Sequence, residues 1–301
     1  MIVTVTPLAE IHLHLEGTVD QETILLLDPN LTREQVAQLW DFHDFTGFLD
    51  CFKFVAQRLN SPEDYALITR RMLDNLAAQG VTYAEVTVAA GVALWRGFDF
   101  SDIWVAIREA QEGSPVEIAW NLDAIRQFGP EHVMEIARLA ANFVGDGAVS
   151  FGIGGDELRG PAHLFGEAYA YAKDAGLRLT AHAGETGPAD SVRQALDIGA
   201  ERIGHGIRAI DDQELIRRLV AEQIPLEVCI TSNVCTGAVP TLNAHPVRKL
   251  FDQGVIITLN TDDPGIFQCD LRGEYELART RFGFSEAELS QIRQNAWDHR
   301  F

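Results

Sequence analysis

The sequence is poor in lysine, in cysteine and in long apolar runs, and each shortage excludes a class of protein. It has 24 Lys and Arg against 44 Asp and Glu, which gives a formal net charge of -20, and only three of its basic residues are lysines. Such a chain repels polyanions, so we expect neither nucleic acid nor an anionic membrane surface as a partner. The four cysteines include no C-x-x-C pair and no disulfide-framework spacing, which is typical of a reducing compartment.

The apolar segments are also too short to cross a membrane, and the N-terminus has no basic stretch followed by an apolar signal segment. We therefore expect a soluble, cytoplasmic protein. No linker, low-complexity tract, repeat or break in composition divides the 301 residues. The sequence therefore predicts a single domain over residues 1–301.

What the chain does contain is a regular alternation of short apolar runs and amphipathic helical segments. The runs lack a polar alternation, which is typical of strands covered on both faces, and they lie at residues 10–16, 81–89, 116–125, 149–157, 177–185, 200–207, 225–232 and 255–262. Helical patterns include 61–79, 130–143, 161–175 and 211–223. Eight such repeats predict an α/β fold, a single (β/α)8 TIM barrel. The competing doubly wound open sheet lacks a G-x-G-x-x-G after its first strand, and the aromatic-rich stretch 20–60 is the expected helical lid.

Histidines and carboxylates recur at the ends of these predicted strands. His12 and His14 are two residues apart, so both side chains point to one face of the first strand. His182 closes the fifth strand, and Asp262 closes the eighth, which neighbours the first in a closed barrel. Three imidazoles and a carboxylate suit one Zn²⁺, although Fe²⁺, Co²⁺ or Mn²⁺ would accept similar ligands. The plainer alternative is a pair of ordinary histidines in H-x-H.

Three further residues beside these motifs are candidates for catalysis or binding. Glu185 follows His182 by three residues and is free to act as a general acid or base, or it is only a carboxylate near a helix start. His205 stands between two glycines at the sixth strand end, and Asp263 follows Asp262. Segment 149–157 has no lysine to bridge a second metal, which indicates a mononuclear site. The remaining histidines are interpreted as surface or packing residues: His43, His132, His163, His245 and His299.

Six motifs in this order resemble those of the adenosine deaminase family. They are H-L-H-L-E-G, G-D-E, H-A-G-E, R-I-G-H-G, T-S-N-V-C-T-G-A and N-T-D-D-P, at residues 12–17, 155–157, 182–185, 202–206, 231–238 and 260–264. The resemblance extends over essentially the whole chain. It implies a (β/α)8 barrel with one zinc ion per chain held by His12, His14, His182 and Asp262. The chain lacks the P-C-x-x-C zinc ligands of cytidine deaminases.

The same resemblance implies a role for each remaining site residue. Glu185 would protonate N1 of a purine, and an activated water would attack C6. His205 would orient that water, and Asp262 would relay its proton. Asp263 would hydrogen-bond N7 and the Gly155 amide would meet N3. Ammonia would leave, so the implied enzyme is a zinc-dependent aminohydrolase.

The choice of purine depends on two positions. Gly204 and the segment 236–238 resemble nucleoside deaminases, whereas free-base adenine deaminases commonly have an acidic residue in place of Gly204. Glu16, the third substrate-binding candidate, replaces the aspartate that binds the ribose 5′-hydroxyl in adenosine deaminases, as in relatives that act on 5′-modified nucleosides or on adenine. We expect a small-molecule purine nucleoside and water as substrates, adenosine or 2′-deoxyadenosine first, a 5′-modified adenosine such as 6-aminodeoxyfutalosine second and adenine third.

Two other classes of function remain as alternatives. A purine-nucleoside-binding module would have lost a ligand or the acid, and this chain has lost neither. A metal hydrolase of lactones or amides would release no ammonia from purines. The sequence leaves open the native metal, the oligomeric state and the pathway.

Overall fold

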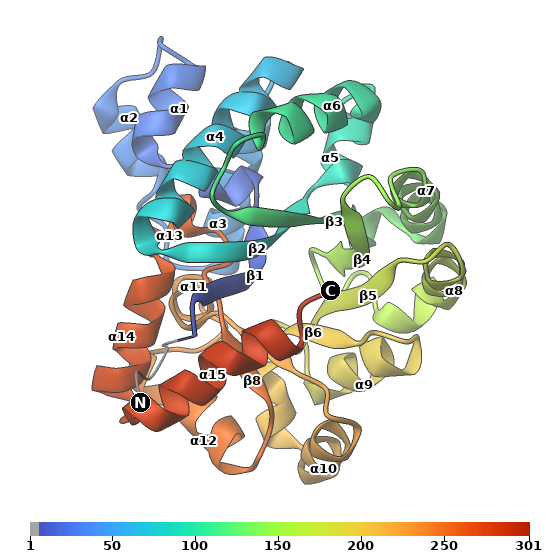
Figure 1. Cartoon of the computed structure of the whole chain (residues 1–301), viewed down its shortest axis with the longest axis vertical. Coiled ribbons are helices and arrows are strands. Elements are labelled where there is room, and N and C mark those ends of the chain that lie inside the picture. Colours follow the sequence, from blue (N-terminus) through green and yellow to red (C-terminus); the bar gives the residue numbers. More distant parts are fainter. Residues whose placement is uncertain (1–5) are drawn as a thin grey trace.

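The centre of the fold is a ring of eight parallel strands (Figure 1), seen in a computed structural model that describes residues 6–301. The strands pair in chain order from β1 to β8. Backbone hydrogen bonds from His14 N to Asp262 O (2.8 Å) and from Asp262 N to His12 O (3.1 Å) join the first and last segments and close the ring. The predicted TIM barrel is therefore confirmed. Its strands are β1 Leu8–His14, β2 Val81–Val88, β3 Glu117–Ile125, β4 Ala148–Gly154, β5 Arg178–Ala183, β6 Arg202–His205, β7 Leu226–Val228 and β8 Ile257–Leu259.

Helices surround this ring on the outside (Figure 1). They are α1 Gln21–Leu27, α2 Arg33–Leu39, α3 Phe45–Ala56, α4 Pro62–Gln79, α5 Ala90–Trp95, α6 Phe100–Ala110, α7 Pro130–Ala141, α8 Gly166–Asp174, α9 Ala189–Asp197, α10 Gln213–Glu222, α11 Ile230–Cys235, α12 Val247–Asp252, α13 Pro264–Phe267, α14 Leu271–Arg281 and α15 Glu286–Asp298. Within residues 6–301, none of them combines the length and apolar character needed to span a bilayer.

Local sequence signals explain where the longest of these helices begins and ends. Ser61 caps α4 through a reciprocal capping box with Asp64, and Pro62 occupies the first turn, where its missing N–H costs nothing. Gly80 ends the helix in the left-handed conformation, with φ of 78°. Strand β2 begins at the next residue, so α4 fixes where this strand enters the barrel.

Seven of the eight predicted strands are longer than the observed ones, mainly because the chain turns earlier at the mouth of the barrel. Segment 225–232 is divided into the short strand β7 and helix α11, which begins at Ile230. The buried carboxylate of Glu274 accepts hydrogen bonds from Ile230 N (2.8 Å) and Thr231 N (3.3 Å), which satisfies the first turn of α11. Cys229 consequently lies between β7 and α11 rather than inside a strand. Asp262 likewise lies beyond the end of β8.

The predicted helical segment 20–60 forms α1, α2 and α3. Phe48 of α3 packs against Phe42, with ring centroids 6.2 Å apart, and against Phe267 of α13 at 5.0 Å. These contacts hold α3 over the loops that follow β1 and β8. The aromatic residues therefore place α3 beside the barrel mouth.

Candidate active site at the strand ends

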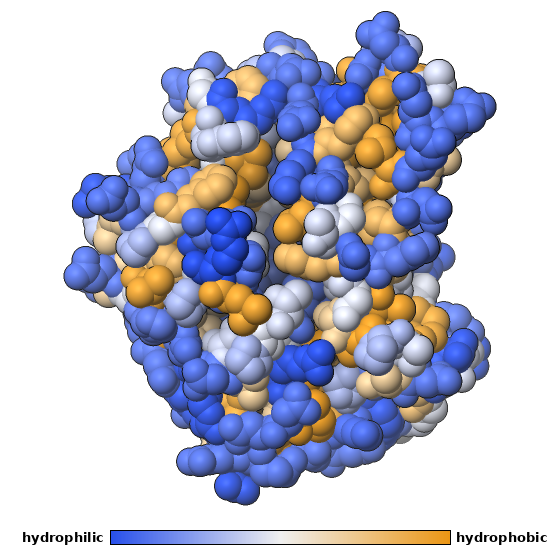
Figure 2. Space-filling model, turned by 180° about the vertical axis from the view of Figure 1, so that it is seen from behind, coloured by the Kyte–Doolittle hydropathy of each residue, from blue (hydrophilic) through white to orange (hydrophobic). Residues whose placement is uncertain are grey.

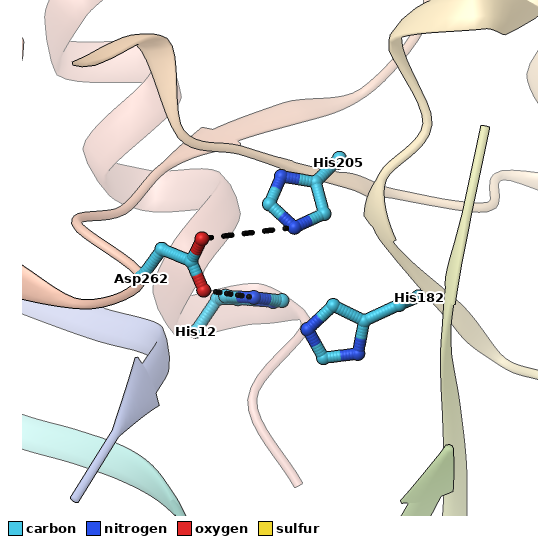
Figure 3. A group of neighbouring side chains, drawn as sticks. All are labelled: His12, His182, His205 and Asp262. Carbon is cyan, nitrogen blue, oxygen red and sulfur yellow. Dashed lines mark ion pairs between the residues drawn. The ribbon is translucent and has the colours of Figure 1, made fainter. Parts of the chain in front are cut away.

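The side chains predicted to bind metal converge at the mouth of the barrel (Figure 3). Ligand atoms of His12, His182, His205 and Asp262 all lie within 4.8 Å of one another. They come from β1, β5, β6 and the segment just after β8. The three rings and the carboxylate face a common centre (Figure 3). Residues 250 positions apart in sequence thus meet because all parallel strands end on one face of a barrel.

His14 belongs to the same cluster. Its Nε2 lies 3.1 Å from His182 Nε2 and 3.3 Å from Asp262 Oδ1. His12 Nε2 is also 3.3 Å from Asp262 Oδ1. The four predicted ligands therefore lie together, and His205 is a fifth group beside them.

The spacing of these atoms fits one tetrahedrally bound cation. Ligands about 2.0–2.1 Å from Zn²⁺ lie about 3.3 Å from one another, close to the separations above. His12 Nε2 is buried and has no hydrogen-bond partner among the described residues, as a ring nitrogen reserved for a metal would be. Burial lowers the pKa of His12, but the carboxylates of Asp262 and Glu227 outweigh it and raise the pKa to about 10. The cluster thus favours positive charge at its centre.

Groups behind the cluster set which ring nitrogens face inward. His12 Nδ1–H donates to Glu227 Oε2 at 2.7 Å, and His182 Nδ1–H donates to the carbonyl of Ile153 at 3.2 Å. With Nδ1–H committed to these acceptors, a cation that takes the place of any proton on Nε2 can bind both rings through this atom. Ser232 Oγ donates to Asp262 Oδ2 at 2.7 Å, which orients the carboxylate. This second layer of contacts is what a metal site requires.

The backbone at two of these residues adopts a conformation that side chains rarely take. His205 has φ of 62° and Asp262 has φ of 66°, both in the left-handed region that favours glycine. The adjacent Gly206 has φ of 65°. These sharp bends at the strand ends turn both side chains into the mouth. The geometry of the site is therefore built into the backbone.

Glu185 lies in the loop after β5 and is buried beside the cluster. Burial, reinforced by the charges of Asp262 and Glu157, raises its pKa to about 8, so the carboxyl group holds its proton at neutral pH. Thr236 Oγ1 donates to Glu185 Oε1 at 3.2 Å. A protonated, oriented carboxyl group is suited to general acid catalysis.

His205 lies between this acid and the cluster. Its Nε2 is 3.7 Å from Glu185 Oε2 and 3.9 Å from Asp262 Oδ2. Burial lowers its pKa to about 4, which keeps the ring neutral. On its other side, Nδ1 is 3.0 Å from Asn233 Nδ2. The ring is therefore positioned to contact a small molecule held between Glu185 and Asp262.

A cavity of about 390 Å³ opens directly above these groups. Its floor includes His182, Glu185, His205, Asp262 and Asp263, and five aromatic side chains form part of its walls: Phe45, Phe48, Phe52, Trp95 and Phe128. Trp95 and Phe128 remain 70% and 44% exposed, and their ring centroids are 6.3 Å apart. Figure 2 shows the face opposite to that of Figure 1, which is hollowed near its middle and bordered there by apolar side chains.

The three predicted substrate-binding residues differ in how they meet this cavity. Asp263 and Gly155 line it, and Asp263 Oδ1 is buried without a hydrogen-bond partner among residues 6–301. Gly17 makes room for Asp263, because a Cβ on Gly17 would lie 1.8 Å from that Oδ1. Glu16 is fully buried behind the wall and accepts a hydrogen bond from Ala89 N at 3.2 Å. It is Ala89, not Glu16, that borders the cavity.

Four polar residues of the site were not assigned a role from the sequence. Glu157 and Asn233 lie inside quoted motifs, so the motifs contained a signal for both. Asp123 lies two residues before the end of β3 and lines the cavity. Glu227 lies inside a short apolar strand that the sequence indicated only as buried. His245 was interpreted as a surface or packing residue, yet it is 4% exposed and its Nε2 lies 3.1 Å from Asn233 Oδ1.

The chain is similar to known proteins over nearly its whole length. The model of the family described as Adenosine deaminase matches residues 7–301. The adenine deaminase of Rhizobium johnstonii is 39% identical over 97% of this chain and 94% of its own length. The aminodeoxyfutalosine deaminase of Streptomyces avermitilis is 36% identical over 98% of this chain and 86% of its own length.

A solved structure matches over nearly the whole chain. The crystal structure of an amidohydrolase from Burkhoderia ambifaria, with bound Zn, superposes with a TM-score of 0.89 at 28% identity. The match covers 98% of this chain and 85% of that one. The fold thus has a solved counterpart.

Proposed function

The chain belongs to the adenosine deaminase family, and from this premise we propose that it is a metal-dependent enzyme that hydrolytically removes the 6-amino group of a 5′-modified adenosine. The observation that carries the proposal is the protonated Glu185 beside the His/Asp cluster, at the floor of a cavity with aromatic walls. One zinc ion, held by His12, His14, His182 and Asp262, would bring the pKa of a water close to 7.

The residues around that water divide the proton transfers among them. Glu185 donates its proton to N1 of the purine, which makes C6 electrophilic. His205, whose Nε2 lies between Glu185 and Asp262, orients the water toward C6. Asp262 accepts the proton of the water. The proton held by Asp262 then passes to the amino group at C6, which leaves as ammonia. The C6 hydroxyl loses its proton to Glu185 as the carbonyl forms, so the acid is restored and the ring becomes that of a 6-oxopurine.

Two further groups hold the purine in place. Burial and the neighbouring charge of Asp262 raise the pKa of Asp263 well above its ordinary value, so this carboxyl group is protonated. A protonated Asp263 can donate a hydrogen bond to N7, which is an acceptor. The Gly155 amide donates to N3, and φ of 95° at this residue is accessible to glycine.

The substrate is proposed from the shape of the cavity and from Gly204. The aromatic walls extend from the floor to exposed Trp95, which suits an apolar group on the 5′ side of a nucleoside. A Cβ at Gly204 would lie 2.7 Å from His12 Cε1, so the acidic residue typical of free-base deaminases would displace this ring. Both features support a nucleoside over adenine.

The relatives' names change the order of substrates expected from the sequence. Adenosine was placed first, but the relatives at 39% and 36% identity are named adenine deaminase and aminodeoxyfutalosine deaminase. We therefore place 6-aminodeoxyfutalosine before adenosine. Adenine is the second candidate, because the name of the 39% identical relative favours it.

A substrate panel tests this order. Purified zinc-loaded protein should turn over 6-aminodeoxyfutalosine with a higher kcat/KM than adenosine or adenine. Trp95→Ala should lower kcat/KM about 5-fold for the 5′-modified substrate and leave adenosine nearly unchanged, because an aromatic contact contributes about 1 kcal/mol. Leu158→Ala, which removes a 72% exposed side chain elsewhere, is the matched control. A higher kcat/KM for adenine would reject the proposed substrate and support the second candidate.

Replacing the acid tests the chemistry itself. Glu185→Gln should retain one equivalent of metal but lose about 10²–10⁴-fold in kcat, because an amide cannot transfer the proton to N1. Ammonia release and metal content are the two measurements. A purine-binding module would release no ammonia even as wild type, and a lactone or amide hydrolase would act only on those substrates.

A further inference from the structure

A chain of buried hydrogen bonds connects His205 to a backbone amide outside the cavity. Val247 N donates to His245 Nδ1 at 3.1 Å, His245 Nε2 lies 3.1 Å from Asn233 Oδ1, and Asn233 Nδ2 lies 3.0 Å from His205 Nδ1. Asn233 is fully buried, and His205 and His245 are 1% and 4% exposed. Nothing in the proposed reaction uses His245 or Asn233.

The backbone N–H of Val247, at one end of this series of hydrogen bonds, fixes the direction of every bond in the series. A backbone N–H can only donate, so His245 Nδ1 must accept, and the proton of the neutral ring must lie on Nε2. His245 Nε2–H then donates to Asn233 Oδ1. The other end of the same amide, Nδ2–H, donates to His205 Nδ1. The remaining proton of His205 is therefore on Nε2, which faces Glu185 and Asp262.

The reversed arrangement is incompatible with these contacts. If the amide of Asn233 were flipped, His245 Nε2 would have to accept while His245 Nδ1 also accepts from Val247 N. A neutral imidazole cannot accept at both nitrogens. Burial, with a smaller effect of His205, lowers the pKa of His245 to about 3, so the ring remains neutral.

We propose that Asn233 and His245 are positioning residues that hold His205 as its Nε2–H tautomer, which makes His205 a hydrogen-bond donor to the reacting water and not a ligand of the metal. The proposal rests on the function proposed above. It also distinguishes His205 from the histidines that would bind the metal. Distance alone does not distinguish them, since His205 lies in the cluster as closely as the other rings. His12 and His182 have Nδ1–H committed to acceptors, which leaves Nε2 for a cation, whereas His205 presents Nε2–H.

Nitrogen NMR of the ring tests the tautomer directly. In zinc-loaded protein labelled with ¹⁵N-histidine, two-bond correlations distinguish protonated from unprotonated ring nitrogens, and His205→Gln identifies the signals of this residue. We expect a protonated Nε2 and an unprotonated Nδ1 at His205. An unprotonated Nε2, whether free or bound to zinc, overturns the proposal.

Variants of the hydrogen-bond relay formed by His245, Asn233 and His205 test its effect on turnover. Asn233→Asp has the same shape but can only accept from both rings, so His205 should shift to the Nδ1–H tautomer and kcat should fall about 10–100-fold. His245→Phe should give a similar loss, and His245→Gln should restore most of it, because its amide can donate to Asn233. Asn243→Asp, an exposed amide outside the relay, is the control.

The outcomes separate this proposal from the proposed function. If His245→Phe and His245→Gln have the same kcat while both remain folded by circular dichroism, the positioning role is wrong. An unchanged His205 spectrum in Asn233→Asp would also contradict it. If no purine is deaminated, the proposed function fails, yet the spectrum of the wild-type holoenzyme still decides the tautomer.

Discussion

At the scale of single residues, the site depends on neighbouring carboxyl groups whose pKa values are shifted in opposite directions. Asp262 has its pKa held well below the ordinary value, because the adjacent His12 and His14, each 3.3 Å from its Oδ1, outweigh the effect of burial. Glu185 and Asp263, without such partners, have raised pKa values. Asp262 is thus an anion that can bind a cation, and Glu185 and Asp263 can donate protons to a purine.

A carboxylate behind the cluster should control metal affinity. Glu227 accepts from His12 Nδ1–H and is ion-paired with Arg202 at 2.6 Å. Glu227→Gln removes the charge, so we expect zinc affinity to fall about 10–100-fold, measured by competition with a chromophoric chelator. Glu201→Gln, which loses a more exposed contact with Arg178, should leave affinity unchanged. Equal affinities in both variants would show that Glu227 does not support the site.

At the scale of elements, the loop after β5 is held by a single buried carboxylate. Glu157 accepts backbone N–H groups from Gly184 (2.7 Å), Glu185 (2.9 Å), Thr186 (2.9 Å) and Gly187 (3.1 Å). The pKa of Glu157 is lowered, because these donors, Ser191 and Arg126 together outweigh burial. Glu185 therefore has its position set by the segment after β4.

Removing this anchor should loosen the loop and slow the reaction together. Glu157→Gln replaces an acceptor of several N–H bonds with an amide that also donates, so we expect a loss of about 2–3 kcal/mol in unfolding free energy. We also expect kcat to fall more than KM rises, because the acid loses its position. Urea unfolding and steady-state kinetics measure the two effects. Glu131→Gln, in the exposed first turn of α7, should change neither.

The elements also show what could be predicted from the sequence. The strands and their order followed from apolar runs, and the convergence of His12, His182 and Asp262 followed from strand ends meeting on one face. Helix α11 was predicted as strand because Ile230 continues an apolar run, and the buried acceptor that starts the helix, Glu274, lies 44 residues later. The His245–Asn233 contact could not be predicted, because it depends on how helix α11 packs against the turn that precedes His245.

At the scale of the whole molecule, some of the acidic side chains that outnumber the basic ones are buried inside the fold. Burial raises the pKa of four carboxyl groups to about 7: Glu10, Glu16, Asp123 and Glu274. Each therefore retains a proton in the fold at a pH where the unfolded chain has released it. Folding is favoured by low pH at these positions, and this contribution is lost as the pH rises toward 7.

Glu274 offers a test of this pH dependence away from the metal cluster. Its pKa is about 7 in the fold and 4.5 in the ordinary state, so its contribution is present below about pH 4.5 and is lost as the pH rises through 7. Between about pH 5 and pH 8, wild type should lose about 2–3 kcal/mol more unfolding free energy than Glu274→Gln, whose side chain does not titrate. Parallel urea-unfolding profiles for the two proteins would contradict the assignment.

The left-handed backbone at His205 and Asp262 has an evolutionary consequence. Glycine takes this conformation without steric cost, whereas a side chain costs roughly 1–2 kcal/mol, so His205→Gly should melt at a higher temperature than His205→Ala. Selection for turnover is what opposes that gain. Homologues that have lost catalytic activity should therefore often have glycine at these two positions. Glycine there would identify inactive homologues from their sequences.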